Sequence, residues 1–76
     1  MMQIHFSRHA KRRARLYNIA ESNIVNVLNA RKLSQGEHEI VEKIAGIGFP
    51  VKIVVHVEDD IITVITSYPL KKGRSE

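Results

Sequence analysis

Apolar residues recur along the chain with two periods, one typical of helices and one typical of strands. Residues 3–6 alternate polar and apolar, which predicts a short strand with Ile4 and Phe6 facing inward. Residues 7–17 and 19–30 instead repeat their small and apolar positions with the spacing of amphipathic helices. The first half of the chain therefore predicts one strand followed by two helices.

Three more strands are predicted in the second half, after a turn at residues 34–36. They cover residues 37–44, 51–58 and 61–68, with a loop at 45–50 and a turn at 59–60. The first has His38 and Glu42 on the same face as its apolar residues, which is typical of an edge or bulged strand. In the last strand, alternation puts four residues on one face: Ile62, Val64, Thr66 and Tyr68.

These elements predict a single α+β domain over residues 1–76, in the order β-α-α-β-β-β. A chain of 76 residues has room for only one hydrophobic core. Short connections favour antiparallel hairpins, so the expected architecture is a twisted antiparallel sheet with both helices packed on one face. A basic tail begins at about residue 70 and is expected to be mobile.

The first helix carries most of the positive charge. Ser7 is its expected N-cap and Asn18 its expected C-cap. Projected at about 100° per residue, the helix has a packing side, a cationic stripe and a shoulder between them. The packing side holds Ala10, Ala14 and Tyr17; the stripe holds Arg8, Lys11, Arg12 and Arg15; the shoulder holds His9 and Arg13.

The formal net charge of +4 is unevenly distributed. Residues 1–36 hold seven basic residues against one acidic, residues 37–62 hold two against six, and residues 63–76 hold three against one. Two positive ends fit a polyanionic partner such as a nucleic acid, although a solvated helix face and a basic tail would give the same pattern. The candidate phosphate-binding residues are Arg8, Lys11, Arg12, Arg15, Lys52, Lys71 and Lys72.

His9 and Arg13 are four residues apart, so they are neighbours on the helix. A histidine can move a proton near neutral pH, and an arginine can hold a phosphate through two hydrogen bonds. Metal-independent RNA cleavage needs such groups: a base for the 2′-hydroxyl, a cation for the phosphorane and an acid for the leaving oxygen. The structural alternative is that His9 bonds a strand carbonyl and Arg13 pairs with Glu42 or Glu58.

Two residues in the strands are further catalytic candidates. Tyr68 ends the last strand, where its hydroxyl could donate a proton or its ring could stack on a base; a half-core position is the alternative. His56 faces the same way as Lys52, so the two line a surface if that face is open. If the face meets the helices instead, His56 is buried and hydrogen-bonded, which the pattern slightly favours.

Several function classes find no support in the sequence. There are no cysteines, so neither disulfides nor thiolate metal sites are expected, which suits a cytoplasmic protein. The four histidines lack the spacing of metal ligands, and no cofactor is expected. No apolar run is long enough to span a membrane, and residues 1–13 lack the pattern of a signal peptide.

The order and spacing of three sequence motifs resemble those of a known family. The chain combines Phe6-Ser7-x-His9-Ala10-x-x-Arg13, a second helix opened by Ile19, and the closing run Val64-Ile65-Thr66-Ser67-Tyr68-Pro69. This pattern resembles a widespread family of small prokaryotic domains of unknown function, which are similar to the RelE/ParE and BrnT-type toxins of type II toxin–antitoxin systems. The resemblance covers nearly the whole chain; members often have Arg and Gly where this chain has Tyr17 and Asn18.

The resemblance implies a RelE-like fold and a toxin that cleaves RNA without a metal, an endoribonuclease neutralised by an antitoxin protein. By motif match it assigns His9, Arg13 and Tyr68 to the site, while His56 and Lys52 are candidates from their position alone. Two other functions stay open. One is a nucleic-acid-binding module without catalysis, and the other is an interaction protein that pairs a sheet edge with itself, as a homodimer, or with an antitoxin.

Overall fold

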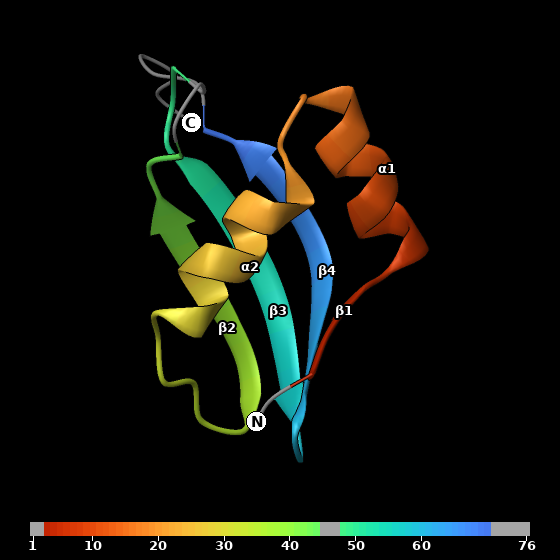
Figure 1. Cartoon of the computed structure of the whole chain (residues 1–76), viewed down its shortest axis with the longest axis vertical. Helices are drawn as coiled ribbons and strands as arrows, with labels where there is room; N and C mark the ends of the chain where they lie inside the picture. The colour runs from red at the N-terminus through yellow and green to blue at the C-terminus, as the bar shows by residue number, and fades with distance from the viewer. Residues whose placement is uncertain (1–2, 45–47, 71–76) are drawn as a thin grey trace.

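A computed structural model gives the fold of the chain and describes residues 3–44 and 48–70. Four strands and two helices follow in the predicted order β-α-α-β-β-β (Figure 1). They are β1 (Gln3–Phe6), α1 (Arg8–Leu16), α2 (Glu21–Asn29), β2 (Gly36–Glu42), β3 (Val51–Glu58) and β4 (Ile61–Pro69). The α+β class and the element order are therefore confirmed, while the first half of the predicted loop at 45–50 and the predicted mobile tail after residue 70 lie outside the described residues.

The four strands form one open sheet in the order β1-β4-β3-β2. β2, β3 and β4 are antiparallel neighbours, as their short connections predict. β1 instead pairs parallel to β4, with Gln3 beside Ile61 and Phe6 beside Val64, so the sheet is mixed rather than wholly antiparallel. No hairpin joins β1 to β4, and connection length therefore says nothing about their relative direction.

α1 is capped at both ends: Ser7 is the N-cap as predicted, whereas the C-cap is Tyr17, one residue before the predicted Asn18. The Ser7 hydroxyl accepts a hydrogen bond from the backbone N–H of Ala10 at 3.0 Å, which satisfies a free donor of the first turn. At the other end Asn18 has a φ of 60°, and the N–H of Ile19 donates to the carbonyl of Ala14 at 2.8 Å. This is a Schellman motif, which ends a helix through one left-handed residue.

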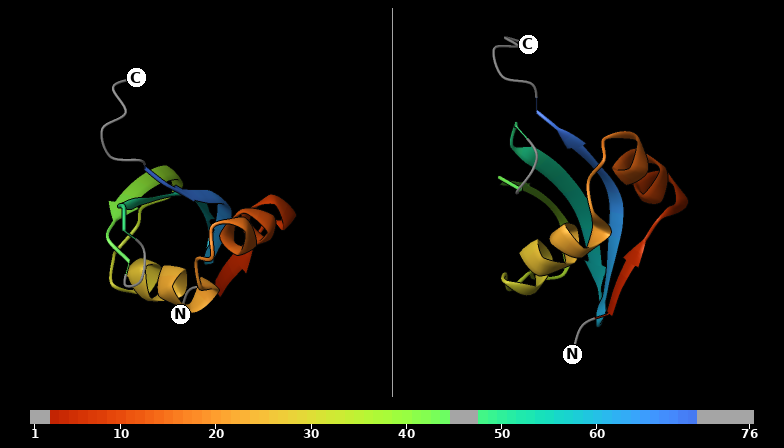
Figure 2. Two further views of the ribbon diagram at one scale, coloured as in Figure 1. Left: turned by 90° about the horizontal axis from the view of Figure 1, so that it is seen from above. Right: turned by 45° about the horizontal axis from the view of Figure 1, so that its top comes forward.

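One hydrophobic core lies between the sheet and the helices. α2 crosses the concave side of the curved sheet, and α1 runs beside β4 (Figure 2). α1 buries only two small residues, Ala10 and Ala14, which lets it approach β4 closely, whereas α2 buries Ile24 and Leu28. The other buried apolar residues are Ile19, Ile40, Ile44, Val51, Ile53, Val55, Val57, Ile62 and Val64, and Tyr17 packs against them as expected.

The opposite, convex side of the sheet is covered by neither helix, and we call it the open face (Figure 2). Because side chains alternate along a strand, every second residue of β2 and β3 points there. These residues are Glu37, Glu39 and Val41 in β2 and Lys52, Val54, His56 and Glu58 in β3.

β4 contains a bulge that the sequence analysis did not predict. Val54 of β3 pairs with Thr66, whereas the next residue, Val55, pairs with Val64. Ile65 is therefore an extra residue in β4 with no partner across the strand pair. An extra residue of this kind bends the strand and shifts the alternation of side chains beyond it.

The bulge overturns part of the predicted face of β4. Ile62 and Val64 point into the core, as expected. Beyond the bulge, the alternation of core-facing and outward-facing side chains is shifted by one residue. Ser67 is therefore buried, while Thr66 and Tyr68 share the open face. The prediction that all four alternating residues share one face is therefore wrong past Val64.

The remaining boundaries differ from the predicted ones by a few residues. α2 begins at Glu21 rather than residue 19, because Ile19 is buried in the connection that closes α1. β2 begins at Gly36, whose φ of 109° suits a residue without a Cβ. β2 is an edge strand, as expected, and has no bulge. Its core-side His38 is half-buried and donates to the carbonyl of Ser34 at 2.8 Å.

Candidate nucleic-acid interface

The cationic stripe of α1 faces solvent. Its four members are exposed and line one shallow hollow: Arg8, Lys11, Arg12 and Arg15. In the described part of the chain, none of these side chains forms an ion pair or a hydrogen bond. α1 also has no acidic residue in its first turn. Over residues 3–44 and 48–70, the stripe thus presents four positive charges that no acidic side chain pairs with.

The shoulder residues of α1 differ in exposure. His9 is exposed, whereas Arg13 is half-buried and donates from Nη1 to the Tyr17 hydroxyl at 3.3 Å. Among residues 3–44 and 48–70, Arg13 pairs with neither Glu42 nor Glu58 and His9 bonds no strand carbonyl, so the structural alternative for this pair is wrong. Arg13 has five N–H donors and gives one to Tyr17, which leaves donors free for an anion.

A second cluster lies on the open face, where Lys52 of β3 is paired in register with Tyr68 of β4. Cross-strand neighbours of this kind have Cβ atoms about 5 Å apart. Lys52 Nζ lies 2.9 Å from Glu39 Oε1, so β2 contributes a third member. The cluster exists only because the bulge at Ile65 turns Tyr68 to this face.

Glu39 raises the pKa of Lys52 above its ordinary value of 10.5, first through a hydrogen bond and then through Coulomb attraction. Tyr68 adds a smaller effect in the same direction, and partial desolvation of the ammonium group opposes it. Lys52 is therefore a cation at neutral pH rather than a base. It can stabilise negative charge that develops beside the Tyr68 hydroxyl.

His56 also lies on the open face, so the expected buried position is wrong. Its side chain is 44% exposed, and its Nε2 lies 3.8 Å from Glu58 Oε1. His56 is four residues beyond Lys52 in β3, a distance of about 13 Å at the usual rise of a strand. Side chains stand roughly perpendicular to a sheet, so these two do not converge on one atom.

The structure thus separates the candidate catalytic residues into two clusters, with His56 apart from both. α1 holds His9 and Arg13, and the open face holds Lys52 and Tyr68. Over the described ranges, no hydrogen bond or ion pair joins the two clusters. Two predicted phosphate contacts lie outside the described residues: Lys71 and Lys72.

Glu39 is the member of the open-face cluster that sequence reasoning missed. The alternation of side chains along the strand could have placed it. Glu39 is next to Ile40, which faces the core, so the side chain of Glu39 must point away from the core. Its contact with Lys52 depends on the register of β2 against β3. The loop between these strands is too long to fix that register as a tight hairpin would.

Two further findings concern ligands and membranes. Within residues 3–44 and 48–70, no three His, Asp or Glu side chains gather closely enough to hold a metal ion. Neither helix in these ranges is long and apolar enough to cross a membrane.

Comparison with known proteins adds no relative. No protein-family model matches the chain, and no curated protein or solved structure matches it either. The protein is therefore described by its fold and its charged surface: it is an α+β domain with a basic helix along the side of a mixed sheet.

Proposed function

We propose that the protein binds RNA through the cationic stripe of α1. The observation that carries this proposal is that the four stripe residues have no ion-pair partner in the described part of the chain. They lie on one side of a single helix, where each can reach a phosphate oxygen of a bound strand. Arginine can do so through two parallel hydrogen bonds, which adds strength and direction.

The stripe is unfavourable for α1 unless an anion neutralises it. Each member has two neighbours of the same sign three or four residues away. Such a like-charge pair destabilises a helix by about 0.2–0.5 kcal/mol. Arg8 and Lys11 also lie near the helix N-terminus, where the helix dipole disfavours cations, whereas Arg15 lies in the last turn, where the dipole favours one. A bound phosphate backbone would remove both penalties.

RNA cleavage without a metal is the second candidate function, and the pairing of Lys52 with Tyr68 favours it. In this reaction the 2′-oxygen attacks phosphorus and loses its proton to a base, while the 5′-oxygen leaves with a proton from an acid. His9 would be the base or the acid, because His56 does not converge with Lys52 and Tyr68 on one atom. Arg13 and Lys52 would stabilise the phosphorane, and the Tyr68 hydroxyl would orient the phosphate or donate the proton.

Cleavage requires the RNA to bridge the two clusters. α1 packs beside β4, and β4 carries Tyr68 on its open face. A strand held by the α1 stripe would therefore pass over β4 to bring one phosphate to Tyr68 and Lys52. This path uses the close approach of α1 that Ala10 and Ala14 permit.

The biological role that fits this chemistry is that of a toxin in a type II toxin–antitoxin system, as the sequence resemblance suggests. RNA would be attacked in the cytoplasm, and an antitoxin protein would neutralise the activity. A short acidic or DNA-binding protein encoded beside this chain would support the role. A neighbourhood without such a reading frame would favour binding without toxicity.

Fluorescence anisotropy with a labelled single-stranded RNA tests binding directly. Arg8→Gln/Arg12→Gln removes two stripe charges, and the control Lys32→Gln/Lys43→Gln removes two exposed charges on other parts of the chain. At one salt concentration we expect the stripe variant to bind roughly tenfold more weakly and the control to match the wild type within about twofold. Equal losses would mean that only net charge matters and would contradict a site on α1.

Cleavage is tested with purified protein and RNA in the presence of EDTA. We expect His9→Ala/Arg13→Ala and Tyr68→Phe to lose about 100-fold or more in rate. His5→Ala, which removes an exposed histidine of β1, should cleave like the wild type. Intact RNA with the wild type, and equal growth of cells that express the wild type or the double variant, would contradict cleavage. RNA binding would then be the function that is left.

A further inference from the structure

The two edges of the sheet differ in how they are protected. On one side β1 is only four residues long, and α1 runs beside β4 beyond the end of β1 (Figure 1). On the other side β2 pairs with β3 over all seven of its residues without a register shift. In residues 3–44 and 48–70, no backbone hydrogen bond reaches β2 from any other element. β2 therefore presents unpaired N–H and C=O groups to which a further strand could be added.

The side chains that border this edge on the open face are acidic. Glu37 and Glu39 are exposed there, beside Val41, which is 50% exposed. Glu39 contacts Lys52, whereas Glu37 has no ion pair within the described ranges. β2 itself contains no basic residue other than a histidine. This edge is thus the negative counterpart of the basic helix on the far side of the sheet.

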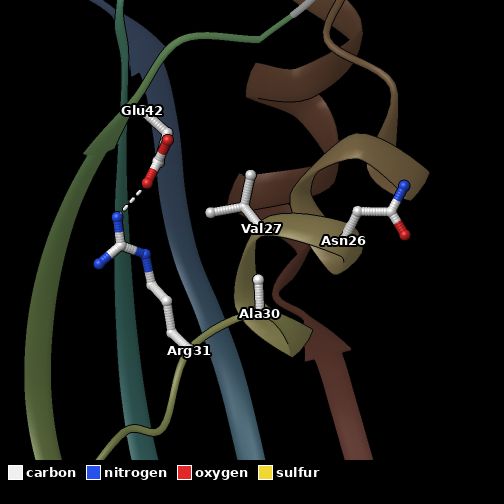
Figure 3. A pocket seen from close by; sticks show the side chains of 5 residues that line it. All are labelled: Asn26, Val27, Ala30, Arg31 and Glu42. Atoms are coloured by element: carbon white, nitrogen blue, oxygen red, sulfur yellow. Dashed lines mark hydrogen bonds and ion pairs between the residues drawn. The ribbon is translucent and has the colours of Figure 1, made fainter.

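A hollow borders the same edge on the core side. It has a volume of about 510 Å³ and lies between α2 and β2. Figure 3 shows Arg31 reaching from the end of α2 to pair with Glu42 of β2, with Val27 and Ala30 on the wall that α2 forms. A strand added beside β2 would place alternate side chains at this hollow and the others opposite the exposed glutamates.

We propose that the β2 edge binds an extended segment of a second protein as an added strand, with Lys or Arg at alternate positions and apolar side chains between them. The basic side chains pair with Glu37 and Glu39, and the apolar ones lie against Val27 and Ala30. Main-chain hydrogen bonds to β2 hold the segment in register. This interaction is separate from RNA binding by the α1 stripe, because β2 is at one edge of the sheet and α1 runs along the other (Figure 1). It shares Glu39 with the open-face cluster, where Glu39 contacts Lys52.

Charge distinguishes this occupant from a second copy of the chain. A two-fold pair of β2 strands centred on the middle of the strand would set Glu39 opposite its own copy. Like charges directly opposite each other destabilise a strand pair, and charged side chains are a common protection of edges against self-association. A basic segment in the same place neutralises the carboxylates instead.

Hydrogen–deuterium exchange of the full chain tests this proposal, with a short synthetic peptide of alternating lysine and valine as the probe. We expect the lysine peptide to slow exchange of the β2 amides that point away from β3 and to leave β1 unchanged. An alternating glutamate and valine peptide should slow exchange in neither strand. Glu37→Lys should weaken binding of the lysine peptide about three- to tenfold. Glu21→Lys, which makes the same change of charge at the start of α2, should not weaken it.

Several results would overturn the proposal. If the β2 amides that point away from β3 are already protected without peptide, the edge is occupied by this chain or by a second copy, and light scattering at several concentrations separates the two. Equal binding of both peptides would contradict the role of the glutamates. No slowing of exchange with either peptide would contradict strand addition at the β2 edge. Glu37→Gln keeps the size of the side chain and provides the same test, with a smaller loss, if Glu37→Lys does not fold.

Discussion

The hydroxyl of Ser7 donates a hydrogen bond to the carbonyl of Ile65 at 3.0 Å, between residues 58 positions apart. Ser7 is the N-cap of α1, and Ile65 is the extra residue of the bulge in β4. The N–H of Ser7 also donates to the carbonyl of Val64 at 3.0 Å. One residue therefore fixes the start of the basic helix and the bulge that turns Tyr68 to the open face.

Removal of the Ser7 hydroxyl is expected to destabilise the fold. Ser7→Ala loses the N-cap hydrogen bond and the partner of the Ile65 carbonyl, which should lower the free energy of unfolding by about 1–3 kcal/mol. Urea unfolding measures this change. Ser34→Ala, at an exposed serine, is the control and should stay within about 0.5 kcal/mol of the wild type. Equal stabilities of the two variants would contradict the role of Ser7.

Removal of the Ser67 hydroxyl is expected to stabilise the fold, in contrast to removal of the Ser7 hydroxyl. The Ser67 hydroxyl is buried by the shift at the bulge and has no hydrogen-bond partner among the described residues. Ser67→Ala removes a polar group that lost its hydration on folding, so the free energy of unfolding should rise by about 1 kcal/mol. The same urea titration measures it. A clear loss of stability would show that the hydroxyl is paired and that this geometry is wrong.

The left-handed residue after α1 gives a third stability test. Asn18 has a φ of 60°, which glycine adopts freely and most other residues adopt at a cost of about 1–2 kcal/mol. Asn18→Gly should therefore keep or raise the melting temperature, and Asn18→Ala should lower it. Asn29→Ala, in the exposed last position of α2, is the control and should be neutral or stabilising. A neutral Asn18→Ala would argue against the Schellman motif.

The element order was predictable because each element carries its own local signal. Ser7 and Asn18 mark the two ends of α1, and alternation marks β3. The direction of β1 was not predictable, because the chain returns to it only after two helices and two strands. The rule that short connections give antiparallel pairs applies to hairpins and has no bearing on β1 and β4.

The open-face cluster could be predicted only in part. Apolar residues at Val64 and Ile65 interrupt the alternation of β4, which is a weak signal of a bulge. Alternation alone does not say which residue is the extra one, since that depends on the partner strand. The face of Tyr68, and with it the pairing to Lys52, therefore required the structure.

The contact between Glu39 and Lys52 should appear in a titration. Since the pKa of Lys52 is raised on folding, this contact stabilises the fold below pH 10.5 and loses its effect as the pH rises through the raised pKa. NMR titration of the Lys52 side chain measures the pKa itself. Glu39→Gln should return it toward 10.5, while Glu37→Gln, on the same face of β2, should leave it unchanged. Equal shifts in both variants would point to long-range charge instead of this contact.

The salt dependence of RNA binding tests the central proposal most directly. For single strands, each phosphate neutralised by a cation contributes about 0.7 to the slope of log affinity against log salt concentration. The variant with all four stripe residues changed, Arg8→Gln, Lys11→Gln, Arg12→Gln and Arg15→Gln, should therefore lose up to about 3 units of slope. Lys32→Gln/Lys43→Gln should keep the slope of the wild type. An unchanged slope in the stripe variant would contradict RNA binding through α1.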